Sequence, residues 1–333
     1  MEKPSLDTAK AGAMRFNTDS SQMEIYDGNQ WTGILATSPE IQTGGTRALI
    51  MGGITSGRTN LVNFISIQTT GDTTDFGDLV QTASQGAGLG SRTRAIAAGG
   101  TPSSPGGTNN IDFATIASTG NFQDFGDMVT TRFSRIAVSN STRGVFFGGA
   151  VAPNYYNNIE FVTIATTGSA NDFGDLYRGR QEAGGAGNAT RGIAVGGDSP
   201  TNETIEYVTI STTGNGAEFG DCSVDIWNIR GGNCGSAVRG VIAGGEPGAS
   251  NAIQFVTIST LGNSVDFGDR TVSKSQITHM SSTTRAVFAG AGEGDTDVID
   301  YVQIANTGNA VDFGNLSENY GWAAGASNGH GGL

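Results

Sequence analysis

The chain has 333 residues, a formal net charge of −13 at pH 7, and 53 glycines but only 7 prolines. The acidic balance argues against nucleic acid as a partner, because phosphate binding needs a concentrated basic surface. No apolar run reaches the roughly 18 residues of a membrane helix, so we expect no membrane insertion. The N-terminal MEKPSLDTAK lacks the apolar segment of a secretory signal. Two cysteines, Cys222 and Cys234, are too few for a disulfide framework, and the sequence leaves open whether they are bonded.

The first predicted element is a β-hairpin within residues 1–34. The runs MRFN and MEIYDG flank the turn TDSSQ and carry strand-forming residues. A hairpin is marginal alone in water, and this one carries many apolar side chains, so we expect it to pack against another molecule. The alternative is packing against the rest of its own chain. Residues 35–45 (LATSPEIQTGG) predict a linker.

The amino-acid sequence of this first element resembles a motif common in tail-fibre and other virion structural proteins of bacteriophages, marine phages and cyanophages in particular. The matching residues are Gly12, Arg15, Phe16, Asn17, Asp19, Glu24, Tyr26, Gly28 and Trp31. The resemblance implies a virion protein, assembled in the host cytoplasm, whose residues 1–40 contact other virion proteins. The implied contact residues are Phe16, Tyr26 and Trp31.

Six tandem repeats fill residues 46–333. An arginine opens an apolar stretch that ends in Gly-Gly or Gly-Ala in every repeat, at intervals of 46–49 residues. A second block carries a glycine five residues before a phenylalanine. The arginines are Arg47, Arg94, Arg143, Arg191, Arg239 and Arg285. The phenylalanines are Phe76, Phe125, Phe173, Phe219, Phe267 and Phe313.

Each repeat contains four short runs rich in β-branched and aromatic residues, and none shows helical periodicity. Four strands in 46–49 residues, repeated six times, predict an all-β fold: a six-bladed β-propeller with four antiparallel strands per blade. The chain enters this region at the second run of a unit and ends with YGWAAGASN, which matches a first run. We therefore expect the C-terminal strand to complete the first blade and close the ring, which removes two unpaired sheet edges.

The paired aromatics after Gly-Gly resemble the kelch repeat. Its first aromatic position is filled here by Phe64, Phe113, Phe161, Tyr207, Phe255 and Tyr301. The resemblance implies six blades but little about activity, because kelch domains have many functions. The repeated DFG is not a kinase motif, since no catalytic HRD or VAIK sequence accompanies it. We expect its phenylalanine to pack between blades.

The recurrent arginine opens the second strand and a recurrent aspartate opens the fourth, so both lie on the same rim of an up-and-down blade. Two interpretations follow: an exposed rim of solvated charges, or half-buried guanidinium groups bonded to carboxylates and loop carbonyls. We favour the second, because lysine never replaces the arginine. The aspartates are Asp75, Asp124, Asp172, Asp266 and Asp312.

The loops between strands two and three, together with those joining blades, share one face and vary in length and chemistry. Variable loops on a rigid scaffold are where recognition usually occurs, although they can also diverge without selection. The candidate binding residues on this face are Tyr155, Tyr156, Tyr177, Arg178, Arg180, Trp227 and His279.

These features favour a phage virion structural protein that displays a propeller, either for recognition of a host-surface glycan or protein or for particle stabilisation. Capsid, tail and fibre locations stay open, as do the ligand and the oligomeric state. The alternatives are a cellular kelch-like scaffold for protein partners and, less favoured, an enzyme acting on polysaccharide. Such an enzyme needs two carboxylates about 5–9.5 Å apart. The acids that do not recur are Glu182, Asp198, Asp225, Glu246, Glu293, Asp295 and Asp297.

We expect no enzymatic activity, because most acidic residues recur with the repeat whereas a catalytic pair should break it. We also expect no cofactor and no metal site, since two histidines do not favour a multi-histidine site. A Ca²⁺ ion near Asp295, with Glu293 and Asp297, stays open because the full spacing of an EF-hand is absent.

Overall fold

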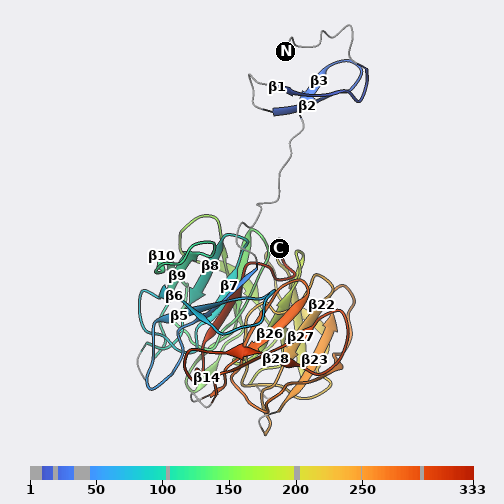
Figure 1. Ribbon diagram of the computed structural model, residues 1–333. Helices are drawn as coiled ribbons and strands as arrows, with labels where there is room; N and C mark the ends of the chain where they lie inside the picture. The colour runs from blue at the N-terminus through green and yellow to red at the C-terminus, as the bar shows by residue number, and fades with distance from the viewer. Residues whose placement is uncertain are drawn as a thin grey trace. The chain divides into compact units, whose positions relative to one another are not determined.

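The computed structural model describes residues 10–17, 22–33, 46–102, 106–198, 203–248, 250–292 and 296–333 (Figure 1). The chain divides into two compact units, residues 1–41 and 42–333. The predicted all-β class is confirmed, because the described residues contain no α-helix. In that part of the chain, no helix has the length and apolar character needed to cross a membrane. The predicted linker, residues 35–45, lies outside the described residues.

The smaller unit is a three-stranded antiparallel sheet rather than the two-stranded hairpin that the sequence predicts. It contains β1 (Met14–Asn17), β2 (Gln22–Tyr26) and β3 (Trp31–Gly33), paired in that order. The third strand forms because Asp27 closes a tight turn: its Oδ1 accepts hydrogen bonds from the backbone N–H groups of Asn29 and Gln30, at 2.7 and 2.8 Å.

The side chains of Arg15 and Trp31 tie this small sheet together. The Arg15 guanidinium lies 4.2 Å from the centre of the Trp31 ring and forms a 2.7 Å ion pair with Glu24. Tyr26 packs against the same ring, with 5.4 Å between ring centres, and is buried. Two of the three predicted virion-contact residues, Tyr26 and Trp31, therefore belong to a defined cluster.

The described residues of the larger unit form six successive main sheets, which we number in chain order, and one short two-stranded sheet. The first contains β29 (Ala324–Ser327), β4 (Arg47–Met51), β5 (Leu61–Ser66) and β6 (Thr74–Asp78). The second contains β7 (Ala87–Gly90), β8 (Arg94–Ala98), β9 (Asn110–Thr115) and β10 (Gln123–Asp127). The third contains β11 (Ile136–Ser139), β12 (Arg143–Phe147), β15 (Asn158–Thr163) and β16 (Asn171–Asp175), with the short pair β13 (Ala150–Val151) and β14 (Asn154–Tyr155) in its loop.

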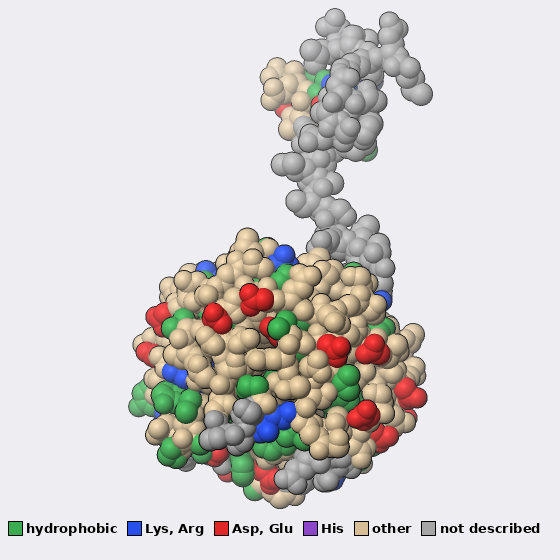
Figure 2. Space-filling model, turned by 90° about the vertical axis from the view of Figure 1, so that its left-hand side faces the viewer, with side chains coloured by type: hydrophobic (Ala, Val, Ile, Leu, Met, Phe, Trp, Pro, Cys, Tyr) green, Lys and Arg blue, Asp and Glu red, His purple; other side chains and the backbone are tan. Residues whose placement is uncertain are grey.

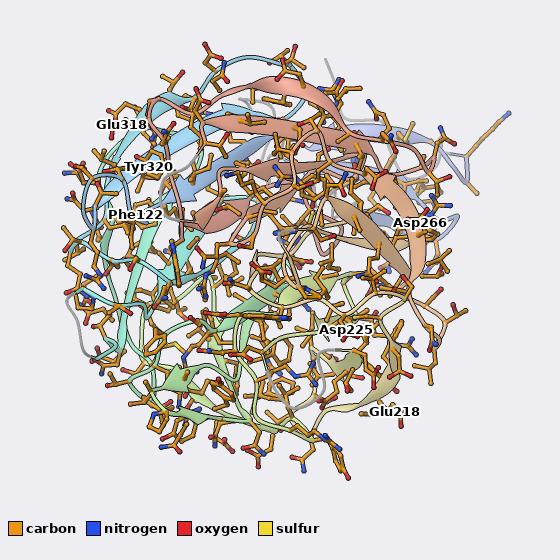
Figure 3. The ribbon with its side chains drawn as sticks, turned by 90° about the horizontal axis from the view of Figure 1, so that it is seen from below. Phe122, Glu218, Asp225, Asp266, Glu318 and Tyr320 are labelled. Carbon is orange, nitrogen blue, oxygen red and sulfur yellow. The ribbon has the colours of Figure 1, made fainter. Side chains whose placement is uncertain are left out.

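The fourth sheet contains β17 (Gly184–Gly187), β18 (Arg191–Val195), β19 (Thr204–Thr209) and β20 (Ala217–Asp221). The fifth contains β22 (Arg239–Ala243), β23 (Ala252–Thr257) and β24 (Val265–Asp269). The sixth contains β25 (Thr278–Ser281), β26 (Arg285–Ala289), β27 (Val298–Gln303) and β28 (Val311–Asn315), joined by β21 (Arg230–Gly231). Figure 3 shows these sheets following one another around the middle of the unit.

The C-terminal strand β29 pairs with β4, as the repeat count predicts. Ala324 faces Met51 and Ser327 faces Ala48 in an antiparallel register. Asn328 directly follows β29, and its side chain accepts a 2.7 Å hydrogen bond from the backbone N–H of Arg47, the first residue of β4. This bond joins the end of the larger unit's chain to its beginning. In the third sheet Asn140 makes the same bond to Arg143 within one continuous turn.

Consecutive sheets meet through pairs of backbone segments that repeat around the unit. In every case the N–H of the glycine after strand three donates to the carbonyl of the recurrent phenylalanine in the preceding sheet. Gly120 donates to Phe76 at 2.7 Å, and Gly71 donates to Phe313 at 2.8 Å, which links the sixth sheet to the first. The contacts therefore run from each sheet to the next and return to the start.

Apolar side chains fill the space between neighbouring sheets. Phe76 is buried and packs with Ala95, Ala114 and Ile116 of the second sheet. The six recurrent phenylalanines are all buried, and each meets the aromatic side chain of the third strand edge to face, with 5.7–6.1 Å between ring centres. Such pairs add to the stabilisation from burial alone.

The fifth sheet departs from the four predicted strands. The segment before β22 runs alongside its neighbours without forming an antiparallel first strand. Instead β21 pairs in parallel with β25, and Asn233 forms a parallel bridge to Gly185 of the fourth sheet. The physical reason is the run Gly231-Gly232-Asn233: Gly232 lacks the Cβ that would approach the Gly325 carbonyl to 2.6 Å, so the backbone can pass close to the C-terminal strand β29.

A glycine in the seam between the sixth and first sheets should be sensitive to substitution. Gly314 has a φ of +150°, and a Cβ there would collide with the Gly71 carbonyl. We expect Gly314→Ala to lower the free energy of unfolding by about 3 kcal/mol, measured by denaturant titration. Gly57→Ala is the matched control, because a Cβ at Gly57 meets no atom within 4 Å. Equal stability of the two variants would contradict the close seam.

Candidate functional site

The recurrent arginines do not pair with the recurrent aspartates, which corrects the sequence prediction. Each half-buried guanidinium lies over the aromatic ring of its own third strand, 4.3–4.9 Å from the ring centre. It also donates to an isoleucine carbonyl of the next sheet, as Arg143 does to Ile210 at 2.9 Å and Arg285 does to Ile67 at 2.9 Å. The five aspartates are exposed, and in the described part of the chain none of them forms an ion pair.

The physical reason is the shape of guanidinium. A flat, weakly hydrated cation can stack on a ring and still donate from its edge, whereas an ammonium group cannot do both. The favoured interpretation was therefore correct about the carbonyls and wrong about the carboxylates.

Five predicted binding residues lie on loops of the variable face. Tyr177 is 80% exposed, and Arg178 beside it is also exposed. Tyr155 is 42% exposed, and its hydroxyl donates to Asp198 at 2.8 Å. The side chains of Tyr156 and Trp227 are half-buried, and Tyr156 lies beneath the Arg132 guanidinium at 4.0 Å.

Arg180 is not a surface residue. Its guanidinium is buried, forms an ion pair with Glu206, and donates to the carbonyls of Gly196 and Thr204, both at 2.9 Å. Burial lowers the pKa of the guanidinium, and the Glu206 carboxylate opposes that shift. Arg180 therefore fastens a loop of the variable face to the sheet below it.

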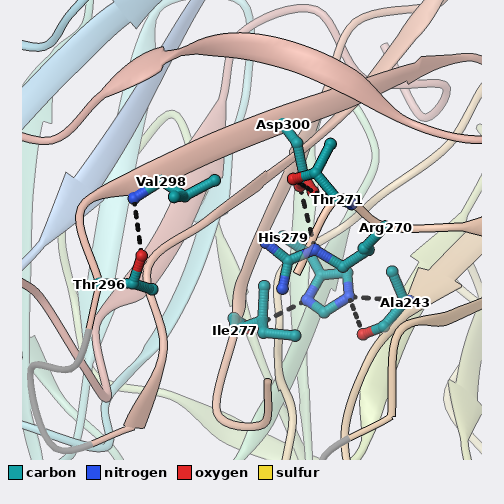
Figure 4. Close-up of polar contacts among 8 residues, drawn as sticks. All are labelled: Ala243, Arg270, Thr271, Ile277, His279, Thr296, Val298 and Asp300. Atoms are coloured by element: carbon teal, nitrogen blue, oxygen red, sulfur yellow. Dashed lines mark hydrogen bonds and ion pairs between the residues drawn. The ribbon is translucent and has the colours of Figure 1, made fainter. Parts of the chain in front are cut away.

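His279 is also buried, within strand β25 (Figure 4). Its Nε2 accepts a hydrogen bond from the Ala243 N–H. The ring is then a neutral imidazole whose Nδ1–H donates to the Ile277 carbonyl oxygen at 3.0 Å. Its ring meets Phe288 edge to face. Burial lowers the pKa of the imidazole to about 4, so it is neutral at pH 7 and links two neighbouring sheets.

A set of buried polar residues on the third strands holds the loops of the variable face, and the sequence analysis missed it. The signal was a polar residue directly before the aromatic residue of each third strand. Three of them accept from loop N–H groups and from an arginine, as Asp300 does from Thr271 and Arg270 at 2.9 and 3.0 Å (Figure 4). The residues in this set are Asn63, Asp112, Glu160, Glu206, Gln254 and Asp300.

Among the described residues, Asp112 is the acidic member of this set that has no cationic partner, and its Oδ2 accepts a hydrogen bond from the Val80 N–H at 3.3 Å. Ala83 occupies the loop position that Arg180 has in the fourth sheet, and the Asp112 Oδ1 atom is buried with no hydrogen bond among the described residues. A water-sized hole of about 20 Å³ lies beside it. Burial raises the pKa of the carboxyl to about 6, because no nearby cation compensates the lost hydration.

Six residues at the centre of the variable face share an unusual backbone conformation. Each lies two residues before the first strand of a unit, or before β21 in the fifth, and has a φ of 55–62°. Backbone hydrogen bonds join several consecutive members, as when Ser134 N–H donates to the Gln85 carbonyl at 2.8 Å and Gln276 N–H donates to the Asn228 carbonyl at 2.6 Å. Five different residue types occupy the six positions, with glutamine at two of them, so this centre breaks the sixfold repeat. The residues are Gln85, Ser134, Glu182, Asn228, Gln276 and Trp322.

The buried Arg230 side chain spans this centre. It donates to the Ser134 hydroxyl at 2.7 Å and to the Glu182 carboxylate at 2.9 Å, and it stacks on Trp322 at 4.5 Å. Glu182 is therefore held in an ion pair.

Two cavities lie beside the loops. One, of about 400 Å³, is lined by Arg58, Gln85, Thr101, Gly106, Phe133, Val151 and Ala152. The other, of about 330 Å³, lies around Tyr177, Arg178, Glu206 and Glu218, and Figure 3 places Glu218 near the edge of the unit. Figure 2 shows acidic side chains scattered over one side of the unit rather than gathered in a patch.

Cys222 and Cys234 are both free thiols. Across the described ranges, no group of three or more His, Cys, Asp and Glu side chains could hold a metal ion. Glu293 and Asp295, considered for Ca²⁺, lie outside those ranges. In comparisons with known proteins, no family model and no curated protein matches the chain.

The Asp112 carboxyl, which has one backbone hydrogen bond and no cationic partner among the described residues, generates a pH-dependent prediction. Its folded pKa of about 6 exceeds the ordinary 3.8, so its ionisation destabilises the fold increasingly as pH rises from about 4 to 6. We expect Asp112→Asn to raise the free energy of unfolding by about 2 kcal/mol at pH 8 and to change it little at pH 4. Denaturant titrations at the two pH values measure this. A destabilised variant at pH 8 would show that the Val80 N–H and other groups stabilise the ionised carboxylate by more than burial destabilises it, which would contradict the prediction.

Proposed function

We propose that residues 46–333 form a kelch-like six-bladed β-propeller whose first blade is completed by the C-terminal strand. The cycle of contacts from each sheet to the next, including those from the sixth sheet back to the first, supports this architecture. The pairing of β29 with β4 supports it as well. The altered fifth sheet is a local departure. The segment before β22 still lies beside that strand, because the Val241 N–H donates to the Cys234 carbonyl at 3.1 Å.

We further propose that the protein is a structural component of a bacteriophage particle. The observation that carries this proposal is the sequence motif in residues 12–31, which resembles that of virion proteins and belongs to a unit separate from the repeats. The cluster of Arg15, Tyr26 and Trp31 orders one face of this small sheet. Met14 and Ile25 pair on the opposite face and are 65% and 37% exposed, so apolar side chains are available there for contact. Such a unit suits attachment to another virion protein.

The propeller would then be displayed for recognition of the host surface, with particle stabilisation as the other role. Exposed tyrosine and arginine side chains on the variable face are typical of recognition surfaces. The buried ion pairs Arg135–Glu160, Arg180–Glu206 and Arg270–Asp300 hold these loops in place. Preordered loops lose less conformational entropy on binding.

Particle association is tested by immunoblotting density-gradient fractions of a phage lysate with an antibody against residues 46–333. The proposal expects the protein to sediment with intact particles and to resist a high-salt wash. Protein found only in the soluble fractions would contradict it.

The attachment role predicts that the two units separate in function. Deleting residues 1–41 should leave a soluble protein with an unchanged β-type circular dichroism spectrum and thermal midpoint, because the larger unit contains all six sheets. The same deletion should abolish sedimentation with particles. A matched variant, Arg15→Gln, weakens the small sheet without removing it and should reduce particle association partially. A truncated protein that unfolds would contradict the separation of the units.

A further inference from the structure

We propose that the 400 Å³ cavity lined by Arg58, Gln85, Thr101, Phe133 and Val151 binds a carboxylate-bearing sugar residue of a surface polysaccharide. The inference rests on the proposed role in surface recognition and names the ligand class and the site. The cavity combines one cation, two neutral hydrogen-bonding side chains and an aromatic ring. Its volume falls within the range of small-molecule sites.

The charge of the cavity favours an anion. Arg58 is exposed, and its Nε donates to the Ser84 hydroxyl at 3.2 Å, which orients the guanidinium. Among the described residues no acidic side chain lines the cavity, although the chain has 31 acidic against 18 basic side chains. In the described part of the chain Arg58 forms no ion pair. A guanidinium edge matches the two oxygens of a carboxylate.

The neutral groups favour a ligand that carries hydroxyls. The Thr101 hydroxyl donates to the Gln85 Oε1 at 3.2 Å, so the Gln85 amide N–H groups can donate to a ligand while the Thr101 oxygen can accept. The Gln85 backbone is fixed by its bond to the Trp322 carbonyl at 2.9 Å. Donors and acceptors are therefore in place before binding.

The apolar part of the wall suits the C–H face of a sugar ring. Phe133 is half-buried and Val151 is 36% exposed, and both line the cavity beside the polar groups. The described lining contains one arginine and no lysine, which favours a single carboxylate over phosphate, because phosphate usually meets several donors or cations. These contacts predict weak binding of a single sugar unit. A polysaccharide that repeats this unit would bind more tightly through several such contacts.

The experiment titrates the full-length, ¹⁵N-labelled protein with sodium glucuronate, glucose and inorganic phosphate, monitored by NMR. We expect glucuronate to bind at least about tenfold more tightly than glucose, because only glucuronate offers the carboxylate. Arg58→Gln should weaken glucuronate binding about tenfold and leave glucose binding unchanged. The control Arg92→Gln is an equal charge change in the turn between β7 and β8, outside the cavity, and should leave both affinities unchanged. Circular dichroism verifies that each variant is folded.

Equal binding of glucose and glucuronate, tighter binding of phosphate, or an unaffected Arg58→Gln variant would overturn the inference. Particle sedimentation of the same variant separates this result from the proposed function. An Arg58→Gln protein that still sediments with particles leaves the virion role intact while the sugar test fails. Arg58-dependent glucuronate binding by a protein absent from particles would leave the site intact and refute the virion role.

Discussion

The arginine that opens each second strand makes the contact on which the rest of the larger unit depends. It stacks on an aromatic ring of its own sheet and donates to a carbonyl of the next, so each sheet is fastened to its neighbour by the same geometry six times. The glycine-to-phenylalanine hydrogen bond fastens the same seam through the backbone. Because Arg285 reaches Ile67, the sixth sheet is bonded to the first, and the loops of the variable face rest on a scaffold without a free end.

The middle of the unit is filled by residues that break the repeat. Arg230 occupies the side of the variable loops, bonded to Ser134 and Glu182. On the other side the His330 imidazole accepts from Asn233 and Gly332 through Nδ1 and lies 3.0 Å from the Gly90 carbonyl. Burial lowers its pKa to about 4, so it is a neutral group at pH 7. Side chains that do not repeat can fill a central space that six identical strands would leave open. The fifth repeat supplies two of them, Arg230 and Asn233, which gives a reason for its divergence.

Spacing in the sequence predicted the elements that depend on backbone geometry: the all-β class, the repeated strands, and the pairing of the C-terminal strand with β4. The sequence could not predict which groups the recurrent arginine contacts. An arginine at the start of the second strand is compatible both with stacking on a ring and with pairing to Asp172 or its equivalents, so its position does not distinguish the two. It also could not separate exposed from buried members of the variable face. Arg180 and His279 resemble Tyr177 and Arg178 in the sequence, yet they are buried by partners about 26 and 36 residues away, Glu206 and Ala243.

Hydrogen exchange at six equivalent glycine amides tests the closed cycle of sheets most directly. Five of these amides donate to a phenylalanine of the preceding repeat, whereas Gly71 donates to Phe313, 242 positions away in the sequence. If the sixth sheet is bonded to the first, the Gly71 amide should exchange as slowly as those of Gly120 and Gly168, because all require the same opening. Rapid exchange at Gly71 alone, with the other five protected, would show that the sheets form an open row and would contradict the account.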